Sequence, residues 1–191
     1  MADVISFDIE TTGLDPDVDD ITVACVYNPS FQRTFHFQHP GYDRQESVEA
    51  FLGQLDKARV LIAFNGVYFD IPFIAKKFDV EAGRYTAWLC KTLDYFMICK
   101  LVFESSCSLN KLLEKNGLNP KTSTGMQAVL WAKEGKWDDI AEYCMDDCKL
   151  TYEVSMMSSV KLPLRGDPDA RVHRCLETGS LSFFRGGEKG V

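Results

Sequence analysis

A strand-like segment that begins at Val4 carries two carboxylates, Asp8 and Glu10, two residues apart. Alternate side chains of a β-strand point to the same face of a sheet, so both carboxylates face the same way. Two anions that share a half-buried surface repel each other and lose hydration, which disfavours folding unless a positive charge lies between them. We therefore expect a sheet that holds a divalent metal ion beside this strand.

The rest of the sequence predicts a mixed sheet covered by helices. The predicted strands are residues 4–9, 21–27, 31–37 and 60–64, with a further strand at 88–94. The predicted helices are residues 46–57, 71–78, 94–103, 108–116, 123–134 and 137–157. The first three strands form an antiparallel meander, and a crossover helix makes the fourth strand parallel. The predicted class is α/β: a mixed central β-sheet, antiparallel meander plus parallel strands, flanked by α-helices.

Length and composition predict one domain and a tail. The chain has 191 residues, 46% of them hydrophobic and 26% charged, which is enough for one well-formed core. From Pro163 onward the sequence becomes polar and rich in glycine. We expect the folded domain to cover residues 1–160 and residues 161–191 to form a loosely held, polar tail.

The sequence carries no sign of export or of membrane insertion. It has no run of about eighteen apolar residues, and the N-terminus lacks the basic and apolar regions of a secretory signal. Its seven cysteines are scattered without a paired framework, which suits reduced thiols. We therefore expect an intracellular protein with no membrane partner.

Two further segments carry candidate site residues. Asp70 follows the buried strand 60–64 at the carboxyl edge of the sheet, although capping of the next helix would also explain an aspartate there. Tyr143 and Asp147 are four residues apart in the last predicted helix and share one face. The apolar residues of that helix indicate that Asp147 points toward the protein body, and the alternative is a partly buried tyrosine beside a solvated Asp-Asp pair.

These three segments together resemble the three ordered motifs of the DEDD exonuclease superfamily. The run Phe7–Gly13 is similar to the first motif, Asn65–Asp70 to the second, and Tyr143 with Asp147 to the third. The resemblance extends from Val4 to Val154 and implies an RNase H-like fold. A tyrosine four residues before the last aspartate is typical of the tyrosine subclass (DEDDy), and the pattern is similar to the proofreading exonuclease domain of family B DNA polymerases.

The resemblance implies a metal-dependent 3′–5′ exonuclease that hydrolyses the phosphodiester bond at the 3′ end of a nucleic acid, with single-stranded DNA favoured over RNA. It implies two Mg²⁺ or Mn²⁺ ions held by Asp8, Glu10 and Asp147, with Asp70 assisting one ion through water. Tyr143 is then expected to orient the attacking water rather than to act as the main base, since an unperturbed phenol titrates near about 10.

The same resemblance implies five substrate-binding residues, namely Thr11, Thr12, Leu14, Asn65 and Phe69. The two threonines are implied to contact the terminal nucleotide, with the leucine beside its base. The asparagine and the phenylalanine are implied to shape the path of the strand. Turn, packing and capping roles are equally open for all five residues.

The charge distribution fits a nuclease that binds its substrate through metal ions more than through a basic surface. The net charge is −7, with ten acidic and two basic residues in 1–50 and thirteen of each in 51–150. This balance argues against tight nonspecific coating of nucleic acid. The candidates for a local basic flank are Lys76, Lys77, Arg84, Lys91, Lys100, Lys111, Lys115 and Lys121. A solvated, mixed-charge surface is the alternative explanation for each of them.

Two other functions fit the same motifs. The first is a catalytically silent nucleic-acid-binding or scaffolding module, against which the intact acidic residues and Tyr143 argue. The second is an RNase H-like endonuclease, which differs from an exonuclease because it cuts a strand whose 3′ end is blocked.

The end of the chain offers one weak partner hypothesis. Residues 177–184 loosely resemble the peptides by which replication proteins bind sliding clamps, so a replication partner could bind the C-terminal tail. The segment departs from that pattern at Glu177, where a glutamine is expected, and at Ser180, where an aliphatic residue is expected. A packed or disordered tail is the competing explanation.

Overall fold

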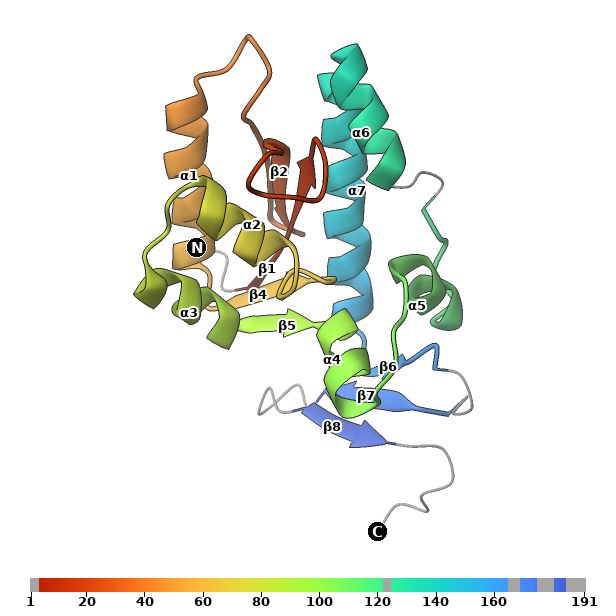
Figure 1. Cartoon of the computed structure of the whole chain (residues 1–191). Helices are drawn as coiled ribbons and strands as arrows, with labels where there is room; N and C mark the ends of the chain where they lie inside the picture. Colours follow the sequence, from red (N-terminus) through yellow and green to blue (C-terminus); the bar gives the residue numbers. More distant parts are fainter. Residues whose placement is uncertain (1–3, 122–124, 165–168, 175–180, 185–191) are drawn as a thin grey trace.

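A five-stranded mixed sheet forms the centre of the protein (Figure 1). The computed structural model describes residues 4–121, 125–164, 169–174 and 181–184. The sheet has the order β3-β2-β1-β4-β5. Its strands are β1 (Val4–Thr11), β2 (Ile21–Asn28), β3 (Phe31–His36), β4 (Val60–Ala63) and β5 (Thr92–Asp94). The first three strands are antiparallel, whereas β4 and β5 continue the sheet parallel to β1. The predicted α/β class and its mixed sheet are confirmed.

Helices cover both faces of this sheet (Figure 1). They are α1 (Arg44–Lys57), α2 (Asp70–Lys77), α3 (Ala82–Cys90), α4 (Tyr95–Val102), α5 (Leu109–Lys115), α6 (Gly125–Glu134) and α7 (Trp137–Ser155). The first three lie on one face, and the long helix α7 crosses the other with α6 beside it. None of these helices is both long and apolar enough to cross a bilayer.

The alternation of β1 assigns its two faces to different tasks. Ile5, Phe7 and Ile9 belong to the main hydrophobic core, which they share with the buried residues of α1, α2 and α3. The intervening residues face α7, because the Ser6 hydroxyl donates a hydrogen bond of 2.7 Å to the carbonyl of Cys148. The period of two therefore brings the carboxylates that follow Ser6 to the α7 side of the sheet.

The segment 88–94 does not form the strand that the sequence predicts over its whole length. The strand is confined to Thr92–Asp94, and Trp88 belongs to α3, a helix that the sequence analysis did not predict. Glu81 caps this helix by accepting the backbone N–H of Arg84. Trp88 is buried on one face of this helix, and its indole N–H donates to Asp56 at 2.9 Å.

The described part of residues 161–191 contains strands, whereas the composition of this segment predicts a loosely held tail. An antiparallel sheet of β6 (Ser159–Lys161), β7 (Arg171–Arg174) and β8 (Leu181–Phe184) lies below α4 and α7 in Figure 1. Leu162, Ala170 and Val172 are buried in a second core with Tyr95 of α4. Widely spaced apolar residues therefore attach this segment despite its polar composition. The division of the chain at residue 160 stays a prediction.

The structure describes only part of the segment that resembles a clamp-binding peptide. Residues 177–180 lie outside the described residues, whereas 181–184 form β8. A role of this segment in binding a replication partner stays a prediction.

Asp94 fixes the connection between β4 and α2. Its buried carboxylate accepts the backbone N–H groups of Asn65 and Val67 on one side and those of Phe96 and Met97, in the first turn of α4, on the other. Asn65 itself has a φ of 68°, a left-handed conformation that asparagine tolerates better than most residues. The connection that leads to Asp70 is therefore held from behind by one side chain.

We expect Asp94→Ala to lower the free energy of unfolding by about 2–4 kcal/mol, because four backbone donors lose a buried acceptor. Asp94→Asn keeps one acceptor oxygen and should cost about 1–2 kcal/mol. Urea unfolding followed by circular dichroism measures both values. A loss below about 0.5 kcal/mol for the alanine variant would contradict the role assigned to this carboxylate.

Candidate metal centre

Three carboxylates from distant parts of the chain meet between β1 and α7. Asp8 and Glu10 come from β1 and Asp147 from α7, and one carboxylate oxygen of each lies within 4.8 Å of the others. Glu10 and Asp147 are buried, and Asp8 is partly buried. The structure therefore brings together the three residues that the sequence analysis expected to hold metal ions.

Asp70 lies near this group but has a partner of its own. Its Oδ1 accepts the backbone N–H of Ile9 at 3.1 Å. The pairing of β1 with β4 ends at Ser6, so the Ile9 amide beyond that point is free to bond with a side chain. Asp70 is the first residue of α2, whose N-cap is Phe69, and the capping role considered from the sequence is wrong. Asp70 instead accepts a hydrogen bond from β1 and lines the same cavity as the carboxylate group.

The turn before Asp70 depends on a glycine. A Cβ on Gly66 would come within 2.5 Å of the Cβ of Ala63 and 3.7 Å of an Asp70 carboxylate oxygen. Since real Cβ atoms do not approach one another so closely, a larger residue here would displace the chain that carries Asp70.

Lys121 supplies the positive charge of the site. Its ammonium donates to Asp147 Oδ2 at 2.5 Å and to the Tyr143 hydroxyl at 2.6 Å. Asn110 of α5 holds the backbone of this lysine on both sides, because it accepts the Lys121 N–H and donates to the Lys121 carbonyl. The sequence analysis named Lys121 only as one of eight flanking basic residues, since nothing in its spacing links it to α7.

The environment shifts the protonation of every carboxylate in the group. Burial, followed by the charges of Asp70, Glu10 and Asp147, raises the pKa of Asp8 well above its usual value. Burial raises the pKa of Asp70 to about 7. It raises that of Asp147 too, although the Lys121 ammonium opposes the shift. Ionisation of these buried carboxylates is therefore unfavourable when no cation is present. A bound cation would stabilise the ionised form.

Tyr143 remains a protonated phenol at neutral pH. Burial and the nearby Asp147 carboxylate raise its pKa above the usual value, although Lys121 opposes the shift. Its hydroxyl lies beside the carboxylates as a hydrogen-bonding group and not as a phenolate base.

The donor atoms fit a divalent metal ion. Asp8 Oδ2 and Asp147 Oδ1 are buried and have no hydrogen-bond partner among the described residues. Three carboxylates against one ammonium leave an excess of negative charge when ionised. Carboxylate oxygens are the ligands that Mg²⁺ and Mn²⁺ prefer. Asp8, Glu10 and Asp147 can therefore hold such an ion, with Asp70 next to them.

A cavity of about 510 Å³ opens onto this group. Its wall contains all four acidic residues, Tyr143 and Lys121, and it also contains Asn65, Phe69, Phe64, Phe96 and residues 107–110 at the start of α5. Two of the five predicted substrate-binding residues, Asn65 and Phe69, thus line the cavity.

The other three predicted substrate-binding residues are not among those that line it. Thr11 donates its hydroxyl to the Gly13 carbonyl, and Thr12 bonds to Asp19 and to the backbone of Asp20. Leu14 is 81% exposed. For both threonines the structure supports the alternative turn role, and a substrate contact of these three residues stays a prediction.

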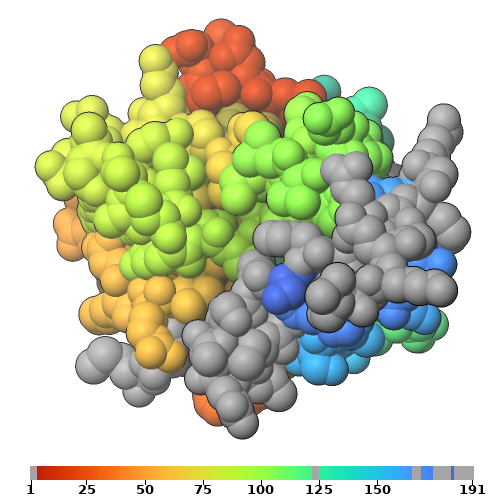
Figure 2. All heavy atoms as spheres, turned by 90° about the horizontal axis from the view of Figure 1, so that it is seen from below, coloured from red at the N-terminus to blue at the C-terminus, as the bar shows by residue number. Residues whose placement is uncertain are grey.

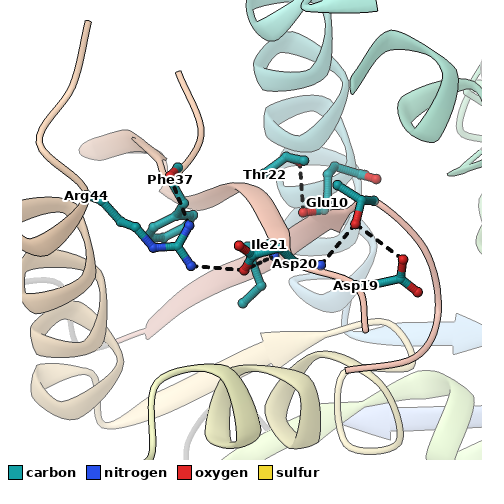
Figure 3. A network of polar contacts seen from close by, with 8 residues as sticks. Glu10, Asp19, Asp20, Ile21, Thr22, Phe37 and Arg44 are labelled. Carbon is teal, nitrogen blue, oxygen red and sulfur yellow. Dashed lines mark hydrogen bonds and ion pairs between the residues drawn. The ribbon is translucent and has the colours of Figure 1, made fainter. Parts of the chain in front are cut away.

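The loop between β1 and β2 is anchored by polar contacts on both sides (Figure 3). Arg44 of α1 pairs with Asp20 at 2.9 Å and also donates to the Phe37 carbonyl. The Thr22 hydroxyl donates to the Glu10 carbonyl at 2.9 Å. The backbone that carries Glu10 is therefore tied to β2.

The fold and the acidic group together define a class of protein, namely an α/β domain with an RNase H-like sheet and a cluster of carboxylates that can bind metal. The chain belongs to the RNase H superfamily, whose family model matches residues 5–157. No curated protein matches it in sequence.

One solved structure similar to this chain is the family B DNA polymerase from the hyperthermophilic archaeon Pyrobaculum calidifontis. The TM-score is 0.58 at 16% sequence identity, and the match covers 78% of this chain. It covers 23% of the polymerase chain, so the likeness concerns one part of that enzyme. The predicted RNase H-like fold is confirmed, and a fold of this kind indicates a nucleic-acid hydrolase.

The carboxylate group predicts a metal-dependent and pH-dependent stability. Because the pKa of Asp70 rises from 3.8 to about 7 on folding, the metal-free protein should lose stability as the pH rises through this window. Mg²⁺ binds the ionised form, so its effect should grow over the same range. Mg²⁺ at about 100 times its Kd should stabilise the protein by about 2.7 kcal/mol and raise Tm by about 5–10 °C at pH 8.

Differential scanning calorimetry at pH 5 and pH 8, with and without Mg²⁺, measures this effect. Asp8→Asn is the variant for comparison and should lose most of the shift at pH 8, because it removes a charged ligand without changing the shape of the side chain. An equal shift in both proteins, or at both pH values, would place the bound metal elsewhere.

Proposed function

We propose that the protein is a metal-dependent 3′–5′ exonuclease that hydrolyses the phosphodiester bond at the 3′ end of a nucleic acid. The convergence of Asp8, Glu10 and Asp147 beside Tyr143, in one cavity, carries the proposal. The resemblance to the DEDD superfamily supports it, since these residues belong to its first and third motifs and Asp70, of the second, lines the same cavity. The tyrosine at position 143 supports the tyrosine subclass within that superfamily.

Two Mg²⁺ or Mn²⁺ ions, when bound, supply an activated water and stabilise the departing 3′ oxygen. Asp8, Glu10 and Asp147 would hold these ions, and Asp70 would assist one of them through water. The Ile9 amide holds Asp70 and the Lys121 ammonium holds Asp147, so the group depends on several parts of the fold and not on one local motif.

Tyr143 orients the attacking water. Its phenol stays protonated because burial raises its pKa, so it donates a hydrogen bond rather than removes a proton. Lys121 fixes the phenol oxygen and brings a positive charge to the place where a phosphate enters. We therefore assign Lys121 to the site as a residue that positions Tyr143 and balances the charge of Asp147.

Single-stranded DNA is the favoured substrate. One solved structure that resembles this chain is a DNA polymerase, and the resemblance found in the sequence is to the proofreading domains of such enzymes. No described residue forms a pattern that would select a 2′-hydroxyl, so RNA is the second substrate to test.

We expect the wild-type protein with Mg²⁺ to shorten a 5′-labelled single-stranded DNA stepwise from its 3′ end, and Asp8→Asn to abolish this hydrolysis while it keeps the wild-type circular dichroism spectrum. The same DNA with a blocked 3′ end should stay intact. Gel electrophoresis of timed samples measures both results.

Each rival function predicts a different gel pattern. A silent binding module leaves both substrates intact, and an endonuclease cuts the blocked strand internally. Wild-type hydrolysis by purified Asp8→Asn would contradict the assignment of the metal site. Parallel digestion of RNA and duplex DNA ranks the substrates.

We expect Tyr143→Phe to lower kcat by about tenfold to 100-fold with a smaller change in KM, since the variant loses one hydrogen bond to a charged or reacting group. Single-turnover rates on the same DNA measure the chemical step. Tyr27→Phe, on β2, is the matched control for the removal of a phenol hydroxyl. An unchanged single-turnover rate for the Tyr143 variant would count against its orienting role.

A further inference from the structure

Three aromatic rings form a row from the wall of the cavity to the protein surface. Phe64 follows β4, Phe96 lies in the first turn of α4, and Tyr68 lies just before α2. The ring centroids of Phe64 and Phe96 are 6.0 Å apart, and those of Phe96 and Tyr68 are 6.1 Å apart. Both pairs meet edge to face, and Tyr68 is 47% exposed. The outer end of the row therefore presents an aromatic surface to solvent.

A lysine accompanies the two outer rings. The ammonium of Lys100, on α4, lies 5.9 Å from the ring centroids of both Tyr68 and Phe96. Lys100 is exposed, and none of the ion pairs found in the described part of the chain includes it. Its charge is therefore available to an anion from solution.

The row is continuous with the candidate metal centre. Phe64 and Phe96 line the same cavity as Asp8, Glu10 and Asp147. Figure 2 shows the green atoms around residue 100 on the surface, between the yellow-green atoms of α3 and the blue atoms of the C-terminal strands. A chain that enters the cavity can thus extend outward over α4.

We propose that Tyr68, Phe96 and Lys100 form a second nucleic-acid-binding site, which holds the nucleotides that precede the 3′-terminal one. Aromatic faces stack on bases of any identity, and a lysine ammonium binds the phosphate between them. This site gives affinity for single strands without sequence selection. The inference rests on the proposed exonuclease function and adds the path by which the rest of the strand leaves the metal centre.

The test compares 5′-labelled single strands of two, four, six and ten nucleotides as substrates. Wild-type KM should fall as the strand lengthens, because longer strands reach the second site. The double variant Tyr68→Ala/Lys100→Ala should lose this preference, with KM for the ten-nucleotide strand raised about tenfold or more. Fluorescence anisotropy with Ca²⁺ in place of Mg²⁺ should show the same loss of affinity for the long strand.

Two conservative variants separate stacking from charge. Tyr68→Phe keeps the ring face and should retain the wild-type length dependence. Lys100→Ala alone should lower the slope of log KM against log salt concentration by about 0.7, the value for one phosphate contact on a single strand. Leu101→Ala, an exposed residue of the same helix, and Lys57→Ala, at the end of α1, are matched controls that should behave as wild type.

The outcomes separate the two proposals. If the wild-type protein neither binds nor hydrolyses any strand, the proposed exonuclease function is wrong. If it hydrolyses DNA but the double variant keeps the full length dependence, or loses activity equally at every length, the second site is wrong. The second site is supported if the double variant loses the length dependence and the wild-type protein and the control variants keep it.

Discussion

The repulsion among buried carboxylates is the constraint to which the rest of the structure responds. Asp8 and Glu10 are brought together by the period of β1, and α7 adds Asp147 to the same small volume. Burial of such a group costs free energy unless cations balance it. Lys121 provides one positive charge, and its position depends on Asn110 of α5. The helices after the sheet are thus part of the electrostatic balance as well as of the hydrophobic core.

A mismatch in strand length creates the opening of the site. β1 continues beyond the last residue that pairs with β4, and its free Ile9 amide is taken by Asp70 at the start of α2. A complete ladder at this edge would leave no room for a carboxylate. The cavity is therefore a consequence of where pairing stops, and the turn at Gly66 carries the chain across the gap.

Much of this arrangement follows from sequence periodicity. The period of two in β1 places Asp8 and Glu10 on one face, and a spacing of four places Tyr143 above Asp147 on α7. The role of Lys121 could not be predicted, because it depends on a loop held by a residue of another helix. The helix α3 was missed because the apolar run around Trp88 fits a strand equally well. The attachment of β6 and β7 was missed because only a few scattered apolar residues cause it.

The carboxylate of Asp94 joins two parts of the molecule that perform different tasks. The same two oxygens receive the turn that leads to Asp70 and the first turn of α4, which carries Phe96. A displacement of α4 would therefore also move the carboxylate that holds the turn before Asp70. A substitution on α4 that changes how it binds nucleic acid would thus also affect the position of Asp70. The sequences of α4 and of the carboxylate group are therefore not free to change independently.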